Sequence, residues 1–379
     1  MAEGRFQVNI DRLVKEFERL VEFDSESFSE REIADYLKTR LKELGLTVQE
    51  DTAGEAIGGN AGNLYAVLPG NLPEGNEDRA ILLSSHLDTV KPGKGKKAVI
   101  HEDGRITSQG TTVLGADDAA GLAEIIEALT VIREREFAHP DIELILPVAE
   151  EPYAQGSKVF DYGKVKAKTA YVLDLSGPVG RAAVAAPSII SLTIRVKGKA
   201  AHAGFCPEAG IHAIRIAAEA IAVLPEGHLD ETTTVNLGTI TGGVAENIVP
   251  DTVEIRGEIR SMEHESALAV AEEIKKEFED AAQAAGGQAE VLIREQFRAY
   301  RIREDEYTVT HFKEACRDLG LSGELEDTFG GSDNNHFTAH GIRGIVVANA
   351  MNEVHTVEEW TSTEELTRAA ELVLRLVTV

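Results

Sequence analysis

A short apolar run that ends in a histidine and a carboxylate constrains this chain more than any other stretch. Residues 80–83 (AILL) carry no polar side chain, which is typical of a strand buried on both faces. His86 and Asp88 follow directly, and in extended chain two residues that are two apart point to the same side. In an open α/β sheet, ligands bind at the carboxyl ends of the strands. The stretch therefore predicts either a metal site or catalytic dyad, or a strand end that meets solvent with ordinary polar residues.

The same pattern recurs along the chain, because acidic residues or a histidine follow other apolar runs or open a helix. These residues are Asp117 and Asp118 in LGADDAAG, Glu150 and Glu151 after residues 141–148, Asp174 after residues 170–173, and His355 after residues 344–349. Several carboxylates at one sheet edge repel each other unless cations neutralise them. Two histidines with carboxylates and no thiolate suit Zn²⁺, Co²⁺ or Mn²⁺. Because two such metals about 3.5–4 Å apart form a known hydrolytic device, the pattern favours a dinuclear hydrolytic site.

The order of the predicted elements indicates two domains. A chain of 379 residues is too long for one ordinary core. Strands alternate with helices over residues 1–186 and again over 300–379, which predicts an α/β domain with a helix-covered, mixed but mainly parallel sheet. Residues 187–299 instead predict strand, helix, two strands, helix and strand, an inserted α+β domain with an antiparallel sheet. Capping boxes, Ser29 with Glu32 and Ser362 with Glu365, predict two helix starts.

Composition excludes several classes of partner. Acidic residues number 65 against 38 basic ones, a net charge of −27 that repels nucleic-acid backbones and anionic lipid. The first residues lack an apolar core behind a basic region, so no signal peptide is evident, and no run is long enough to span a bilayer. The two cysteines, Cys206 and Cys316, indicate neither a disulfide framework nor a thiolate metal site. We therefore expect a cytoplasmic protein with neither nucleic-acid nor membrane partners.

Seven motifs in one order resemble the M20 family of dinuclear zinc metallopeptidases, and most closely its peptidase T-like aminotripeptidases. The motifs are HLDTV, LGADDAAG, AEE, YVLD, AHAG, GGSDNN and NEVHT, and they extend over essentially the whole chain. The resemblance implies a phosphorylase/hydrolase-like catalytic domain interrupted by a ferredoxin-like lid and dimerisation domain. It also implies two Zn²⁺ ions, a short peptide as substrate, and a homodimer formed through the lid.

The resemblance assigns roles to the residues at the strand ends. Asp117 resembles the carboxylate that bridges the two metals. His86 and Asp174 would complete one zinc site, and Glu151 and His355 the other. Glu150 matches the general base that takes a proton from the water between the metals. Asp88 matches the carboxylate that orients His86 through its other ring nitrogen.

Five further positions match the family's oxyanion-stabilising and substrate-binding parts. His202 resembles the lid histidine that stabilises the tetrahedral oxyanion, which the partner subunit often donates. Asn247 and Arg260 match lid positions that hold the peptide backbone or its carboxylate. Gly331 and Ser332 lie in a segment that resembles the substrate-binding loop. An ordinary loop histidine, a solvated strand arginine and a plain glycine turn are the competing interpretations.

The sequence departs from the family pattern at two positions. Tyr153 stands where a glycine is usual after the paired glutamates, which puts a preference for tripeptides in doubt. Ala119 replaces a lysine that usually follows the paired aspartates.

The leading hypothesis is an exopeptidase that releases the N-terminal residue of tripeptides. A carboxypeptidase or an N-acyl-amino-acid deacylase of the same clan would keep the metals and change the substrate. A dimeric scaffold without activity is the third hypothesis, and the complete set of predicted ligands and base argues against it.

Overall fold

The computed structural model describes residues 5–73 and 80–379, which divide into two compact units. The first unit comprises residues up to 185 together with 301–328 and 332–379. The second comprises residues 186–300 together with 329–331. None of the helices in the described ranges is both long and apolar enough to cross a membrane.

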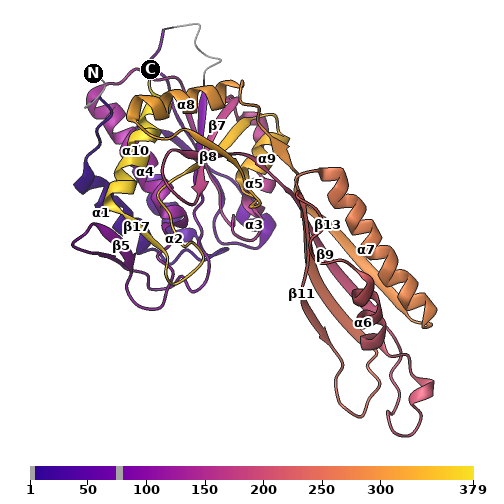
Figure 1. Ribbon diagram of the computed structural model, residues 1–379. Coiled ribbons are helices and arrows are strands. Elements are labelled where there is room, and N and C mark those ends of the chain that lie inside the picture. Colours follow the sequence, from indigo (N-terminus) through magenta and orange to yellow (C-terminus); the bar gives the residue numbers. More distant parts are fainter. Residues whose placement is uncertain (1–4, 74–79) are drawn as a thin grey trace. The chain divides into compact units, whose positions relative to one another are not determined.

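A mixed sheet, nine-stranded in the described residues, forms the centre of the first unit (Figure 1). Its strands in spatial order are β1 (Thr47–Glu50), β2 (Leu64–Leu68), β6 (Ile142–Leu146), β3 (Ile81–Ser84), β7 (Thr169–Leu175), β16 (Arg343–Ala348), β8 (Arg181–Ala186) and β14 (Tyr300–Arg301), with β15 (Glu324–Asp327) beside β8. The four central strands β6, β3, β7 and β16 are parallel. Their carboxyl ends therefore meet at one edge of the sheet.

Helices cover both faces of this sheet. They are α1 (Ile10–Val21), α2 (Arg31–Glu43), α3 (Ala53–Ile57), α4 (Ala116–Arg135), α5 (Gln155–Lys158), α8 (Tyr307–Leu319), α9 (Asp333–Ala339) and α10 (Thr363–Val377). On β7, Val172 packs in a cluster with Phe337 of α9, whereas the Tyr171 hydroxyl, on the opposite face, donates to the carbonyl of Thr308 in α8. Because both faces are covered, the central strands are mainly apolar, although β6 buries one carboxylate, Glu143.

Helix α4 is buried from Ala116 to Ile132, with only its last three residues exposed, which explains why its sequence has no polar stripe. Gly121 allows its close approach to the sheet, because a Cβ there would lie 2.9 Å from the Cβ of Leu173 and 2.9 Å from the Oγ of Ser85. Asp117 and Asp118 have non-helical backbone angles, so regular helix begins after them. The two aspartates are thus held at the sheet edge by a helix that the core fixes.

A small antiparallel sheet of β4 (Ala98–Ile100), β5 (Arg105–Ser108) and β17 (Trp360–Ser362) completes the first unit. The predicted cap at Ser362 is present, since its Oγ accepts the N–H of Glu365. The predicted capping box at Ser29 is wrong, because Glu30 occupies the N-cap of α2 without a side-chain cap bond. The Glu30 carboxylate instead accepts the N–H groups of Phe28 and Ala149.

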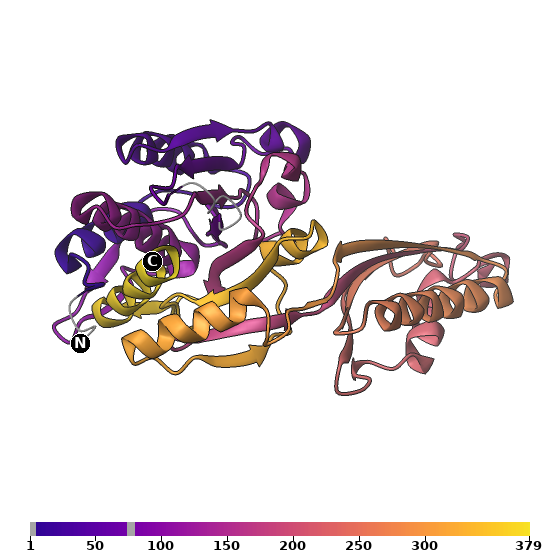
Figure 2. The ribbon, with the colours of Figure 1, turned by 90° about the horizontal axis from the view of Figure 1, so that it is seen from above.

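The second unit is a five-stranded antiparallel sheet with helices on one face (Figures 1 and 2). In chain order its elements are β9 (Ser188–Lys197), α6 (Ala213–Val223), β10 (Gly227–His228), β11 (Thr233–Gly242), β12 (Thr252–Ser261), α7 (His264–Ala284) and β13 (Gln288–Phe297). The spatial order β10-β11-β12-β9-β13 contains the ferredoxin-like arrangement of four strands. The predicted fold class, a mixed α/β domain with a separate α+β domain, is confirmed.

Candidate metal centre

His86 lies directly beyond β3 and is held by contacts on both ring nitrogens and on its backbone. Its Nε2 lies 2.9 Å from Oδ1 of Asp117 and 3.9 Å from Oδ1 of Asp174. Its Nδ1 lies 2.9 Å from the backbone oxygen of Asp88 and 3.5 Å from the Oδ1 of that residue. Its backbone N–H donates to Oδ2 of Asp118. The side chain is thus fixed with Nε2 facing the cluster of carboxylates.

The Asp88 carboxylate holds the backbone of the paired glutamates. Its Oδ1 accepts the N–H of Glu150 at 2.8 Å, and its Oδ2 accepts the N–H of Glu151 at 3.2 Å. The Ser27 hydroxyl also donates to Oδ2, at 2.7 Å. The structure therefore places Asp88 beneath both glutamates, with its backbone rather than its carboxylate nearest to the His86 ring.

The two neighbouring aspartates make different contacts. Asp117 lies between two imidazoles, with Oδ1 2.9 Å from Nε2 of His86 and Oδ2 3.1 Å from Nε2 of His355. Asp118 accepts the His86 N–H and, at 2.6 Å, the side-chain amide of Asn349. Asp117 thus faces the cluster, and Asp118 braces the segments around it.

His355 reaches the cluster from the loop after β16. Its Nε2 lies 3.0 Å from Oε2 of Glu151, and its backbone has a positive φ of 63°. The side chain is 52% exposed, whereas that of His86 is buried. Asp117 therefore contacts one buried imidazole, that of His86, and one solvent-accessible imidazole, that of His355.

The geometry and the donor set suit metal ions. Ligand atoms of His86, Asp117 and Glu151 all lie within 4.8 Å of one another, and so do those of His86, Glu150 and Asp174. The Oε1 atom of Glu151 is buried and makes no hydrogen bond. Imidazole nitrogens and carboxylate oxygens are ligands of Zn²⁺ and similar divalent ions. The predicted cluster is therefore a candidate site for more than one cation.

The electrostatics of the cluster agree with this interpretation. Burial, reinforced by the charge of Asp174, raises the pKa of Glu150, and burial with the charge of Asp117 raises that of Glu151. Contacts with Asp117 and Glu151 raise the pKa of His355 to about 10. Protons thus offset the excess negative charge, and a bound cation would replace them.

Within the second unit, His202 and Asn247 come from adjacent loops. The Ala203 N–H donates to the Asn247 carbonyl, and His202 forms a bridge with Ile248. Nδ1 of His202 accepts the N–H groups of Gly204 and Phe205, which places the ring proton on Nε2. His202 is therefore an exposed hydrogen-bond donor.

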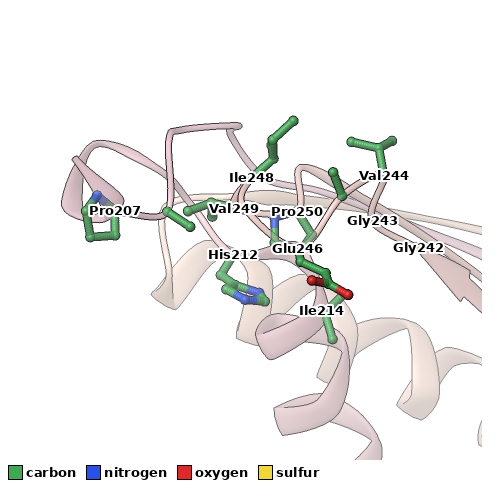
Figure 3. Close-up of a pocket in the computed structure, with 12 residues that line it drawn as sticks. Pro207, His212, Ile214, Gly242, Gly243, Val244, Glu246, Ile248, Val249 and Pro250 are labelled. Carbon is green, nitrogen blue, oxygen red and sulfur yellow. The ribbon is translucent and has the colours of Figure 1, made fainter. Parts of the chain in front are cut away.

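The same end of the second unit has an exposed apolar surface. Phe205, stacked on His202, is 86% exposed, and Val244 is 77% exposed. A hollow beside them is lined in part by His212, Val244 and Ile248 (Figure 3). Large exposed apolar side chains gathered on one surface are typical of an interaction surface.

The other predicted substrate-binding residues have local contacts of their own. Arg260 donates to Glu258 and to the carbonyl of Phe329. A Cβ at Gly331 would lie 2.5 Å from the Phe297 ring, so packing requires glycine there. Ser332 is the N-cap of α9. Their substrate contacts stay predictions.

Two further buried acidic residues lie near the cluster: Asp333, predicted only as part of the substrate-binding loop, and Glu359, which the sequence analysis missed. Asp333 accepts the Ser157 hydroxyl at 2.5 Å, and Glu359 accepts the N–H groups of Gly115 and Asp117. Asp333 adjoins the predicted Ser332, and Glu359 is in the same loop as His355. Neither follows a buried strand directly, so the strand-end pattern did not select them.

Comparison with known proteins identifies the family. Residues 184–286 match the family model described as the M20 peptidase dimerisation domain, and residues 63–202 match peptidase family M28. The structure resembles a tripeptidase from Staphylococcus aureus (36% identity, TM-score 0.93) and the aminopeptidase PepT from Bacillus cereus (40% identity, TM-score 0.89), each match covering 98% of both chains. The fold is also that of the Bacillus subtilis protein YXEP, a dinuclear metal-binding peptidase of the M20 family (21% identity, TM-score 0.72, 99% of this chain and 98% of the other). The chain therefore belongs to the M20 family of peptidases, the family that its ordered motifs predicted.

Proposed function

We propose that this peptidase uses two divalent metal ions to hydrolyse short peptides and releases the N-terminal residue of tripeptides. The observation that carries the proposal is the cluster around His86 at the carboxyl ends of the parallel strands, where Asp117 and Glu151 form one group with His86 and Glu150 and Asp174 form another. We assign Glu150 of the second group as the base rather than as a ligand. The likeness to a tripeptidase and to an aminopeptidase favours the same substrate class.

In this proposal His86 and Asp174 would hold one cation, Glu151 and His355 would hold the other, and Asp117 would contribute to both sites. The two oxygens of Asp117 facing different imidazoles support that assignment. Zn²⁺ suits the donor set best, with Co²⁺ or Mn²⁺ as alternatives. Two cations held there would polarise the scissile carbonyl and lower the pKa of water.

Glu150 serves as the general base. It is 8% exposed, and its pKa is raised by burial and by Asp174, so it exchanges protons more readily than an ordinary carboxylate. It takes a proton from the water whose oxygen attacks the carbonyl carbon. It then passes that proton to the amine nitrogen as the C–N bond breaks. Asp88 holds the Glu150 backbone in place for both steps.

The charge of the site favours a substrate with a free amino terminus. Besides the proposed ligands and base, the site contains the buried carboxylate of Asp333, whose charge adds to burial and to Asp174 in raising the pKa of Glu150. The ion-pair partners of Asp117, Asp174 and Glu151 are the two histidines. Two divalent cations would offset four of these negative charges, and the carboxylates beyond that number would attract an ammonium group and repel a terminal carboxylate. This favours aminopeptidase over carboxypeptidase action.

The second unit would supply dimer contacts and the oxyanion donor. Beyond Val235, β11 lies at the edge of its sheet and is mostly exposed, and an open edge is a template for pairing with another strand. We propose that two copies pair through this domain, and that Nε2–H of His202 donates to the developing oxyanion of the partner's substrate. Asn247 and Arg260 would hold the peptide backbone or its carboxylate, and Gly331 and Ser332 would belong to the substrate-binding loop.

Hydrolysis of a free tripeptide and of its N-acetylated form, each with and without chelator, tests the proposed function. We expect release of the N-terminal residue from the free peptide only, loss of activity with chelator, and recovery with Zn²⁺. Release of the C-terminal residue from the blocked peptide would indicate a carboxypeptidase, and release of acetate would indicate a deacylase. No hydrolysis by protein that has bound two metal ions would favour a scaffold.

A further inference from the structure

Glu359 is a buried carboxylate in a loop that is otherwise mostly exposed. It is 1% exposed, whereas His355 and the residues from Thr356 to Glu358 are exposed. Its Oε2 accepts the N–H of Gly115 at 2.6 Å, and its Oε1 accepts the N–H of Asp117 at 2.9 Å. Each oxygen of one side chain thus binds the segment that carries Asp117, which is 242 residues away in sequence.

These N–H groups need an acceptor from outside their own helix. Gly115 precedes α4 with a left-handed φ of 75°, and Asp117 is non-helical, so neither N–H has an intrahelical acceptor. The Lys96 side chain packs against the same backbone, since a Cβ at Gly115 would lie 2.9 Å from the Lys96 Cε. Glu359 therefore fixes a segment that approaches its neighbours too closely to carry a side chain at Gly115.

The loop that carries His355 is closed at its base by a pair of backbone hydrogen bonds next to Glu359. Asn352 and Trp360 exchange two backbone hydrogen bonds of 3.1 Å, and Glu359 lies beside this pair. Between these anchors His355 stands half exposed, with its Nε2 3.1 Å from Oδ2 of Asp117. The bonds from Glu359 to the Asp117 segment thus connect the two parts of the chain that bring His355 and Asp117 together.

We propose that Glu359 is a positioning residue that sets the separation of His355 and Asp117, and with it the affinity of the cluster for one of its two cations. This inference rests on the proposed function, because it assumes that both residues are ligands. Glu359 itself touches no reacting atom. It acts by holding one ligand-bearing segment against the other, as residues behind metal ligands do elsewhere.

The test compares Glu359→Gln with Glu358→Gln, a matched control at the exposed neighbouring position. Glutamine presents one oxygen and one NH₂ group, so one of the two N–H donors at the start of α4 would face another donor. Co²⁺ titration of the metal-free proteins, followed by visible absorption, should show one of two equivalents bound about 10–100-fold more weakly in Glu359→Gln. Its kcat should fall with little change in KM. The control should match wild type in both measurements.

Thermal unfolding of the metal-free proteins separates positioning from general stabilisation. If Glu359→Gln unfolds at a lower temperature but binds both Co²⁺ equivalents as wild type does, Glu359 is only a structural brace and the inference is overturned. If the glutamine variant does not fold, Glu359→Asp carries the test, because it keeps the carboxylate and shortens the side chain by one methylene. Fewer than two Co²⁺ ions per wild-type chain would instead contradict the proposed function.

Discussion

Replacing Glu150 by glutamine gives the sharpest test of the chemistry, because the change removes a proton acceptor without altering the size of the side chain. The carboxylate of Glu150 is buried, and the neighbouring charges of Asp174, Asp333 and Glu151 all raise its pKa. A neutral amide at this position removes part of that repulsion. We therefore expect the free energy of unfolding of metal-free Glu150→Gln to be unchanged or higher, although activity is lost.

The expected loss of activity is large. A positioned general base contributes about 10²–10⁴-fold, so kcat should fall by at least about 10²-fold, or about 2.7 kcal/mol of the barrier. KM should change little, since Glu150 transfers protons during the reaction and is not proposed to bind the substrate beforehand. Metal content should stay at the wild-type value, because the proposed ligands remain.

Glu151→Gln is the matched comparison at the adjacent position. Oε2 of Glu151 lies 3.0 Å from His355, and its Oε1 has no hydrogen-bond partner, so this side chain is placed as a ligand. Its replacement should lower the metal content measured by atomic emission, and activity should partly return at high Zn²⁺. If Glu150→Gln loses metal and Glu151→Gln keeps it, the assignment of base and ligand is reversed. If Glu150→Gln keeps wild-type kcat, Glu150 is not the base.

Three more predictions concern contacts away from this pair. Asp88→Asn would turn an amide group toward the backbone N–H donors of Glu150 and Glu151. Urea titration should therefore show a loss of about 1–3 kcal/mol in the free energy of unfolding. An unchanged free energy would contradict the role of Asp88 in holding the two glutamates. Burial raises the pKa of Glu50, but its bonds with Arg31, Gly62 and Lys38 outweigh burial and lower it from 4.5 to about 2. That stabilisation, about 1 kcal/mol because solvent screens these partly exposed ion pairs, is fully present above the unfolded pKa and is lost as pH falls through the folded pKa. The difference in stability between wild type and Glu50→Gln should therefore shrink in acid, and a constant difference would refute the prediction. His202→Ala should bind metal normally and lose about 2.7–4 kcal/mol of transition-state stabilisation. If the histidine acts across a dimer, mixing this variant with Glu150→Gln should restore part of the activity. No recovery after verified subunit exchange would mean that it does not act across a dimer.

The sequence by itself determined the fold class and the residues that gather at the sheet edge. Apolar runs such as residues 80–83 have no polar face, so we expect them to be buried on both sides, and helix-covered parallel strands place their carboxyl ends together. The meeting of polar residues just beyond such strands, such as His86, can therefore be predicted from the sequence alone. The alternation of β12 likewise predicted a sheet with one covered face.

Only the tertiary structure decided which atoms meet within that cluster. The pattern at Ser29 predicted a capping box, but Glu30 occupies the N-cap, and its carboxylate binds the backbone next to Glu150. The Asp88 carboxylate, predicted to orient His86, lies 3.5 Å from the His86 ring and also accepts two backbone N–H groups just beyond the neighbouring strand. The contact of Glu359 with Asp117 joins positions that no local pattern relates. Periodicity reports which face of an element is buried, whereas the acceptor that a buried N–H group finds depends on which distant segment the packed core brings to it.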